Sequence, residues 1–370
     1  MKDVRDKIII LILLLAVLFL CYGSVVFSAS EISISAKAAV LYEPTTGSFL
    51  YTKNADKRLP MASTTKIMTA LVAIENCNLD EIVLIDERSV GIEGSSLYLK
   101  AGEEMTMRNL LTGLMLRSAN DAAAAIAYKI SGSIDEFATL MNNKAYELGL
   151  KNTNFKNPHG LDDEGHYTSA RDLAILSATA LENKIFREIS SAKKEKITNS
   201  DGEVRLVCNH NKLLSLYDGA IGIKTGYTKR SGRCLVGAAE RDGLRFIAVT
   251  INAPDDWNDH KKLFDYGYAS LRCYRVEAGE FRYSLPLIGG KNDFLTVTNK
   301  DAFSIVIPQN VNEIKSEIKL NKYAVAPIKQ GEHLGKIFFT LDGETIGVCP
   351  LVSQYDEPLQ KRLSKQKKDN

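Results

Sequence analysis

Strand-like segments at two distant places in the chain set the strongest limit on its fold. Residues 38–42 and 48–51 are apolar and aromatic runs on either side of a Thr-, Pro- and Gly-containing turn, which predicts a β-hairpin. Three more strand-like runs follow much later, at residues 220–228, 234–239 and 244–251. Because helical patterns fill the stretch between them, we expect one antiparallel sheet packed by helices, with a helical insert.

The helical patterns are clearest where alanine is frequent or where apolar residues recur at helical spacing. They cover residues 107–116, 121–130, 134–148, 170–180 and 257–271. From about Tyr274 the pattern changes to short strands separated by turns, which predicts a small all-β domain. The expected fold class is therefore α+β.

The two ends of the chain differ from the rest. A charged segment, residues 1–7, precedes the apolar run 8–20, which is shorter than a membrane-spanning helix usually is and typical of a secretory signal. Cleavage after Ser28 or Ser30 fits the preference for small residues, and an uncleaved anchor is the alternative. The last residues are polar and basic, and we expect either a solvated tail or electrostatic contact with an anionic membrane.

These patterns predict four parts. They are a signal peptide at 1–30, a domain of strands and helices at 31–274, a β-domain at 275–353 and a basic tail at 354–370. The 370 residues carry a formal net charge of +2, and no basic surface with interleaved aromatics is evident before the tail, so we expect no nucleic-acid partner. Five scattered cysteines remain after the signal, which is no disulfide framework.

No spacing of His and Cys suits a metal, and we expect neither a metal nor another cofactor. His159 and His166 flank an acidic loop, where a structural or hydrogen-bonding role is the expectation.

The stretch from Pro60 to Lys66 is the first candidate for chemistry. If a helix begins near Ser63, the Lys66 amine lies beside the Ser63 hydroxyl, because residues three apart share a helix face. A serine needs a base to act as a nucleophile, and a lysine can serve if burial lowers its pKa. Ser-x-x-Lys also occurs at Ser190, Ser191, Ser316 and Ser364, so the spacing alone leaves an ordinary helix N-cap as the alternative.

Two more motifs follow in order. Ser118-Ala119-Asn120 lies in an expected turn between helices, and Lys224-Thr225-Gly226 lies on an expected strand. Ser-x-x-Lys, Ser-Asp-Asn and Lys-Thr-Gly in this order are the marks of serine β-lactamases and penicillin-binding proteins. The second motif here reads Ser-Ala-Asn, which departs from the β-lactamase form but is usual among low-molecular-mass penicillin-binding proteins. Together with Asn157-Pro158-His159-Gly160-Leu161, the three motifs make the chain resemble serine-type D-alanyl-D-alanine carboxypeptidases, the low-molecular-mass penicillin-binding proteins. The resemblance implies a β-lactamase/transpeptidase-like catalytic domain followed by the β-domain.

The resemblance also implies roles for individual residues. Ser63 would attack the bond between two D-alanines of a peptidoglycan stem peptide, with Lys66 as base and Ser118, Asn120 and Lys224 as a hydrogen-bonded ring. The amides of Ser63 and Tyr227 would bind the oxyanion. Gly226 would let the substrate approach the strand, and Thr225 with Arg245 would hold the terminal carboxylate.

β-Lactams would be covalent inhibitors of such an enzyme. A serine β-lactamase and a catalytically inactive cell-wall-binding protein are the alternative functions. Against the first, the sequence has no Glu-x-x-Leu-Asn loop to hold a deacylating water; against the second, every motif is intact.

Overall fold

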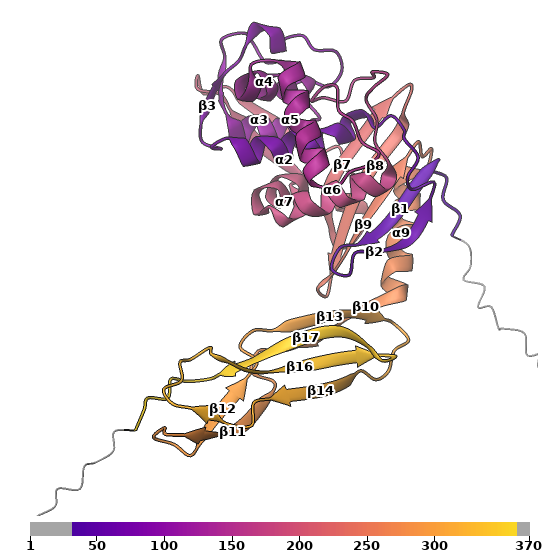
Figure 1. Ribbon diagram of the computed structural model, residues 1–370. Helices are drawn as coiled ribbons and strands as arrows, with labels where there is room; N and C mark the ends of the chain where they lie inside the picture. Colours follow the sequence, from indigo (N-terminus) through magenta and orange to yellow (C-terminus); the bar gives the residue numbers. More distant parts are fainter. Residues whose placement is uncertain (1–31, 361–370) are drawn as a thin grey trace, which may run out of the picture. The chain divides into compact units, whose positions relative to one another are not determined.

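A five-stranded antiparallel sheet organises the first part of the protein (Figure 1). Its order is β2-β1-β9-β8-β7, so strands from both ends of this part lie side by side. The strands are β1 Ala38–Glu43, β2 Ser48–Lys53, β7 Ala220–Thr228, β8 Gly232–Arg241 and β9 Leu244–Ile251. The expectation of one antiparallel sheet with a helical insert is confirmed.

The computed structural model describes residues 32–360. The expected signal peptide and the residues 361–370 of the expected basic tail lie outside that range. Within it, no helix is long and apolar enough to cross a membrane.

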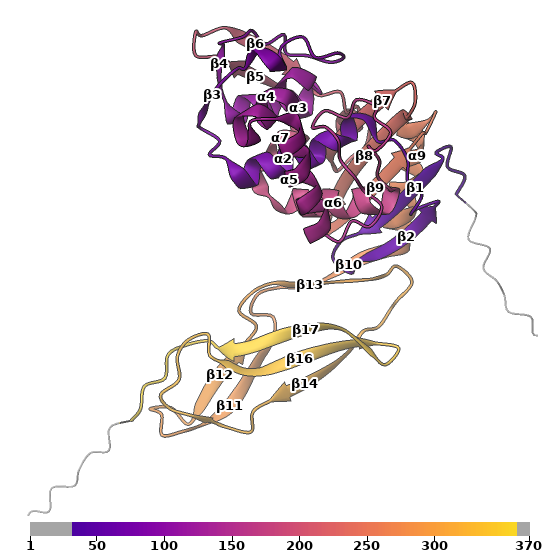
Figure 2. The same ribbon diagram turned by 45° about the horizontal axis from the view of Figure 1, so that its top comes forward.

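Helices cover both faces of the sheet (Figures 1 and 2). On one face α6 contacts β1 and β9 while α7 contacts β7, and on the other α9 contacts β8 and β9. Two 3-10 helices also occur, η1 Ala62–Thr65 and η2 Glu87–Ser89. The α-helices are α2 Lys66–Asn76, α3 Met107–Leu116, α4 Asn120–Ser131, α5 Ile134–Glu147, α6 Ala170–Glu182, α7 Lys184–Ser191, α8 Leu213–Leu216 and α9 Asp256–Ser270.

Two short pairs of antiparallel strands in the helical part have no counterpart in the sequence expectations. β3 Ile82–Leu84 pairs with β4 Glu104–Thr106, and β5 Lys194–Thr198 pairs with β6 Val204–Cys208. Each of these four strands has a single buried residue, so a continuous apolar signal is missing from all of them. Helix α7 was also not expected, because its eight residues are short for periodicity to show.

The last part is all-β, as expected. Its strands are β10 Leu271–Val276, β11 Arg282–Ile288, β12 Phe294–Thr298, β13 Phe303–Pro308, β14 Lys315–Leu320, β15 Ala324–Val325, β16 His333–Leu341 and β17 Glu344–Ser353. β10 pairs with β13, and the other six form a sheet in the order β14-β16-β17-β12-β11-β15. This sheet has its own buried cluster around Val297, Ile337 and Leu351, separate from the cluster of the first part.

The burial of residues in the first part predicts that two substitutions in one helix have very different effects on the free energy of unfolding. Phe137 on α5 is fully buried, whereas Tyr146 on the same helix is 86% exposed. Phe137→Ala should lower the free energy of unfolding by about 3–5 kcal/mol, because a large aromatic side chain leaves a cavity. Tyr146→Ala should change it by no more than about 0.5 kcal/mol. Urea denaturation followed by far-UV circular dichroism measures both, and equal effects would contradict this account of the core.

Candidate active site

Ser63 lies in the 3-10 helix η1, directly before α2. The neighbouring hydroxyls turn back to the backbone, Thr64 Oγ1 to the Met61 carbonyl at 2.6 Å and Thr65 Oγ1 to the Ala62 carbonyl at 2.8 Å. Neither η1 nor α2 has a side-chain N-cap bond. The interpretation of Ser63 as a helix N-cap is therefore wrong, and its hydroxyl is left for other contacts.

The Lys66 amine sits within hydrogen-bond distance of three oxygens. Its Nζ lies 3.1 Å from Ser63 Oγ, 2.6 Å from Asn120 Oδ1 and 2.5 Å from the His159 carbonyl oxygen. Lys66 is fully buried. The Lys66 amine thus contacts groups from three segments: η1, the start of α4 and the loop at residues 157–161.

Burial holds the pKa of Lys66 well below its ordinary value. The nearby positive charge of Lys224 lowers the pKa further, and the buried Asp121 carboxylate opposes both effects. The result is an amine that loses its proton far more readily than an exposed lysine does.

Asn120 is oriented by its own contacts. Its Nδ2 donates to the Glu93 carbonyl at 2.5 Å, which turns Oδ1 toward Lys66. Its backbone N–H donates to the Ser95 carbonyl at 2.7 Å. Ser118, two residues earlier, has a left-handed backbone with φ of 61°, an uncommon conformation for a serine that is typical of strained functional positions.

Asp121 was not expected to matter for the site. Its buried carboxylate accepts from the Leu97 N–H at 3.0 Å, the Leu99 N–H at 3.2 Å and Ser96 Oγ at 2.6 Å. It therefore fixes the loop that carries Ser95. A charged residue in the first turn of an alanine-rich helix was the only signal in the sequence, and such residues are common there.

Lys224 comes from β7, the edge strand of the sheet. The side chain is buried, and its Nζ donates to the Thr225 carbonyl at 3.0 Å. Burial lowers the pKa of Lys224 to about 7. The positive charge of Lys224 is one of the causes that lower the pKa of Lys66.

Gly226 allows β7 to approach η1 closely. A Cβ at this position would lie 3.0 Å from the Ser63 backbone nitrogen and 3.2 Å from the Met61 carbonyl oxygen. Gly160 has a similar role on the other side of η1, where a Cβ would lie only 2.0 Å from the Ala62 carbonyl oxygen. Both glycines are therefore needed for backbone to pack against the turn that presents Ser63.

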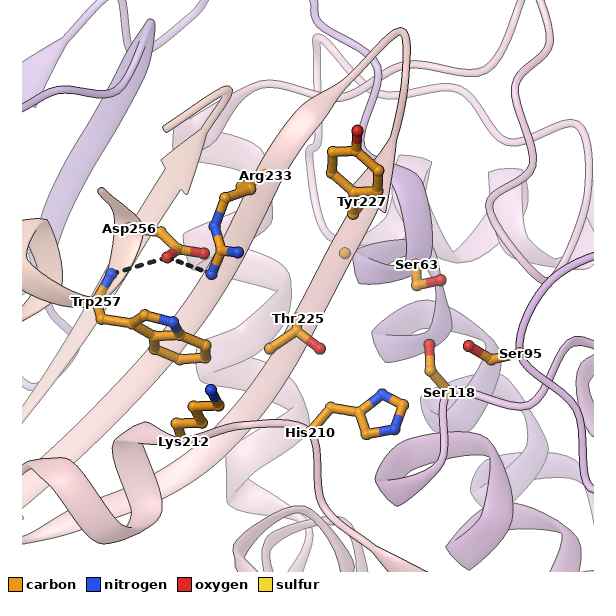
Figure 3. Close-up of a pocket in the computed structure, with 11 residues that line it drawn as sticks. Ser63, Ser95, Ser118, His210, Lys212, Thr225, Tyr227, Arg233, Asp256 and Trp257 are labelled. Atoms are coloured by element: carbon orange, nitrogen blue, oxygen red, sulfur yellow. Dashed lines mark hydrogen bonds and ion pairs between the residues drawn. The ribbon is translucent and has the colours of Figure 1, made fainter. Parts of the chain in front are cut away.

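A cleft of about 410 Å³ opens between these elements. Ser63, Ser95 and Ser118 lie on one side of it, facing Thr225 and Tyr227 of β7 (Figure 3). Arg233, Asp256 and Trp257 line the other side of β7, with His210 and Lys212 below them in the view. Five of the residues expected at the site line this cleft: Ser63, Ser118, Thr225, Gly226 and Tyr227. The buried Lys66 joins Ser63 to Asn120 through its amine.

Arg245 does not lie in the cleft, and this expectation is corrected. It pairs with Glu240 in the sheet, and its guanidinium contacts Glu240 at 2.8 Å and Glu182 at 2.7 Å. The residue of β9 in register with Gly226 is Ile251, because both are aligned with Cys234 of β8. Arg245 lies six residues before Ile251, roughly 20 Å away along the strand. The arginine that lines the cleft is Arg233 on β8.

The two histidines of the acidic loop make hydrogen bonds, as expected. His166 Nδ1 accepts from the Lys156 N–H at 3.0 Å, and its Nε2 lies 2.7 Å from Thr65 Oγ1. Burial lowers the pKa of His166 to about 4 and that of His159 to about 3. Both rings are therefore neutral near pH 7 and support the loop that brings the His159 carbonyl to Lys66.

Comparison with known proteins identifies two family models along the chain. The model for D-alanyl-D-alanine carboxypeptidase matches residues 25–255, and the model for the penicillin-binding protein 5 C-terminal domain matches residues 276–358.

Individual relatives agree with these matches. D-alanyl-D-alanine carboxypeptidase DacF from Bacillus subtilis is 35% identical over 93% of both chains, and DacC from Escherichia coli is 32% identical over 86% of this chain and 84% of its own. The crystal structure of penicillin-binding protein 5 from Haemophilus influenzae is 30% identical, covers 88% of this chain and 98% of its own, and superposes with a TM-score of 0.65. The chain therefore belongs to the D-alanyl-D-alanine carboxypeptidase family and is a hydrolase of that kind.

Proposed function

We propose that Ser63 is the nucleophile of this carboxypeptidase and that Lys66 is its general base. The observation that carries this proposal is the set of partners around the Lys66 amine. Asn120 Oδ1 and the His159 carbonyl oxygen can only accept hydrogen bonds. A neutral amine has two N–H bonds, which these two acceptors take, so its lone pair is left for Ser63 Oγ–H at 3.1 Å.

The reaction then follows from this arrangement. Lys66 takes the hydroxyl proton as Ser63 Oγ bonds to the carbonyl carbon between the last two D-alanines. The carbonyl oxygen becomes an oxyanion, for which the backbone amides of Ser63 and Tyr227 are the proposed donors. Each such donor is typically worth about 3 kcal/mol in the transition state.

Collapse of the tetrahedral intermediate needs a proton on the departing nitrogen. We assign to Ser118, which faces the same cleft, the role of carrying this proton from Lys66 to the departing nitrogen. The positive charge of Lys224 favours the neutral state of Lys66. The C–N bond breaks, D-alanine leaves, and Ser63 is esterified. Water, deprotonated by Lys66, then attacks the ester and restores the hydroxyl.

The substrate expected for a member of this family is a peptidoglycan stem peptide that ends in D-Ala-D-Ala. The outer edge of β7 supports this choice, because an edge strand can pair with an extended peptide. β-Lactams are expected to acylate the same serine. Family membership favours this function over a β-lactamase or an inactive cell-wall-binding protein.

A location outside the cytoplasmic membrane is part of the proposal. It is supported by the signal-like residues 1–20 and by a substrate that belongs to the cell wall. We further propose that the basic residues of the tail make peripheral contact with anionic lipid, at about 1 kcal/mol for each Lys or Arg near the surface.

The nucleophile is tested with a labelled penicillin. Ser63→Ala should abolish covalent labelling and lower the release of D-alanine by roughly a million-fold, because no other hydroxyl replaces a nucleophile. Ser316→Ala is the matched control, since Ser316 has the same Ser-x-x-Lys spacing on an exposed strand of the β-domain. Full labelling of Ser63→Ala, or loss of labelling in Ser316→Ala, would refute the assignment.

The base is tested through the pH profile. Lys66 acts only when neutral, so kcat/KM should fall as the pH drops below the pKa of Lys66. Lys224→Gln removes a charge that lowers this pKa, and the acidic limb should therefore move to higher pH while activity at the optimum falls about 10²- to 10⁴-fold. A limb that stays in place or moves to lower pH would contradict the role of Lys224.

The tail is tested with vesicles. A chain lacking residues 361–370 should sediment less with vesicles of anionic phospholipid than the full chain does, at low ionic strength. Zwitterionic vesicles are the control and should bind neither chain. Equal binding of both chains to anionic vesicles would contradict the proposed contact.

A further inference from the structure

The carboxylate of Asp121 is buried directly after the second motif, in the first turn of α4. We propose that Asp121 is a positioning residue of the reaction, which fixes the segment that orients Asn120 and is the buried counter-charge when Lys66 takes up a proton. This inference rests on the proposed function, because it takes Lys66 as the base.

Asp121 holds the segment at residues 93–99 by accepting hydrogen bonds from it. Both carboxylate oxygens lie 3.0 Å from the Leu97 N–H nitrogen. Oδ2 also accepts from the Leu99 N–H at 3.2 Å and from Ser96 Oγ at 2.6 Å, and Oδ1 accepts from the Ala122 N–H at 2.8 Å. An amide would turn its NH₂ toward a backbone N–H in either orientation, so the position requires a carboxylate.

The same segment orients Asn120 from two points. The Glu93 carbonyl accepts from Asn120 Nδ2 at 2.5 Å, and the Ser95 carbonyl accepts from the Asn120 N–H at 2.7 Å. Because Nδ2 is held in this way, Oδ1 faces Lys66 Nζ at 2.6 Å. Ser95 also lines the cleft (Figure 3). Asp121 therefore acts on the base through the backbone of this segment and through Asn120.

The charge of the carboxylate has a second effect. Lys66 is 0% exposed, and Lys224 and Asp121 are each 1% exposed. When Lys66 takes the proton of Ser63, a second cation forms beside Lys224, where solvent does not screen it. Burial and Lys224 lower the pKa of Lys66, and the Asp121 carboxylate opposes both effects. It therefore stabilises the protonated amine that each proton transfer produces.

The histidines near the two lysines do not supply this charge. Burial lowers the pKa of His159 to about 3 and that of His166 to about 4, so both rings are neutral near pH 7. The pKa of His210 is lowered by burial and by the positive charges of Lys224 and Arg117. A neutral imidazole offsets no cation, so the role of counter-charge falls to the carboxylate.

The other charged groups beside α4 lie in contact with solvent. The elements packed against it are α2, α3, α5, η2 and β3. Charged side chains on or next to these elements form ion pairs that are at least partly exposed: Arg88 with Asp86, Lys129 with Glu81, Lys144 with Glu75, and Arg108 with Glu188. Other charged side chains there are exposed: Glu87, Arg117, Asp135 and Glu136. Solvent screens such groups, whereas Asp121 is enclosed.

The test is the pH profile of D-alanine release from an acyl-D-Ala-D-Ala peptide. Asp121→Asn removes a negative charge that raises the pKa of Lys66, so the acidic limb of kcat/KM should move to lower pH by roughly one unit. Because the segment at residues 93–99 also loses an acceptor, kcat/KM at the optimum should fall roughly 10- to 100-fold. Lysine labelled with ¹³C at Cε should show Lys66 titrating at lower pH in the same variant.

Asp172→Asn is the matched control. Asp172 is also a buried carboxylate in the first turn of a helix, α6, and it accepts from the Asn152 N–H at 2.6 Å and from Thr153 Oγ1 at 2.8 Å. Its replacement should lower the free energy of unfolding, as that of Asp121 does, because backbone and hydroxyl donors lose their acceptor. The acidic limb of the wild type should nevertheless stay in place.

Ser96→Ala is a milder variant, which keeps the charge and removes one hydrogen bond to it. It should lower kcat/KM by roughly 3- to 10-fold without moving the acidic limb to lower pH, and it tests the positioning role even if Asp121→Asn does not fold. An unchanged kcat/KM in Ser96→Ala would overturn that role.

The acidic limb decides the rest. A limb of Asp121→Asn that stays in place or moves to higher pH would overturn the proposal, as would an equal shift in Asp172→Asn. If the wild type releases no D-alanine, the proposed function fails. If the wild type is active and the limb of Asp121→Asn stays in place, only this inference fails.

Discussion

The active site depends on one buried amine with a specific set of neighbours. Lys66 is enclosed by protein, yet every oxygen within hydrogen-bond distance of its Nζ has a defined chemical role. Two of these oxygens can only accept, and the third belongs to the nucleophile. Burial favours the neutral amine, and its two committed N–H bonds direct the lone pair toward Ser63. The chemistry therefore follows from desolvation and from the geometry of hydrogen bonds together.

The close approach of β7 to η1 is the second constraint. The strand, the 3-10 turn and the loop at residues 157–161 pack backbone against backbone, with Gly226 and Gly160 at the tightest points. This packing brings Lys224 from one side and the His159 carbonyl from the other toward the same amine. The sheet thus supplies a rigid edge, and the helices supply the reacting groups.

Much of this arrangement could be predicted from the sequence, because strands and long helices carry strong periodic signals. The three motifs also identified which distant segments meet. The geometry of a single turn could not be predicted: Ser63 lies within a 3-10 helix, although its sequence context is that of an N-cap. Arg233 lies on β8, which pairs with β7, and Arg245 lies on β9, the next strand of the sheet. Only the strand register shows which of the two arginines lies at the cleft.

The protonation state of Lys66 tests the central claim most directly. Lysine labelled with ¹³C at Cε gives a resonance that shifts when the amine titrates, and the spectrum of Lys66→Gln assigns the peak. The account predicts a Lys66 pKa well below the ordinary value of 10.5, so that a large neutral fraction exists at the pH of activity. Titration near 10.5, like that of an exposed lysine, would contradict the assignment of Lys66 as the base.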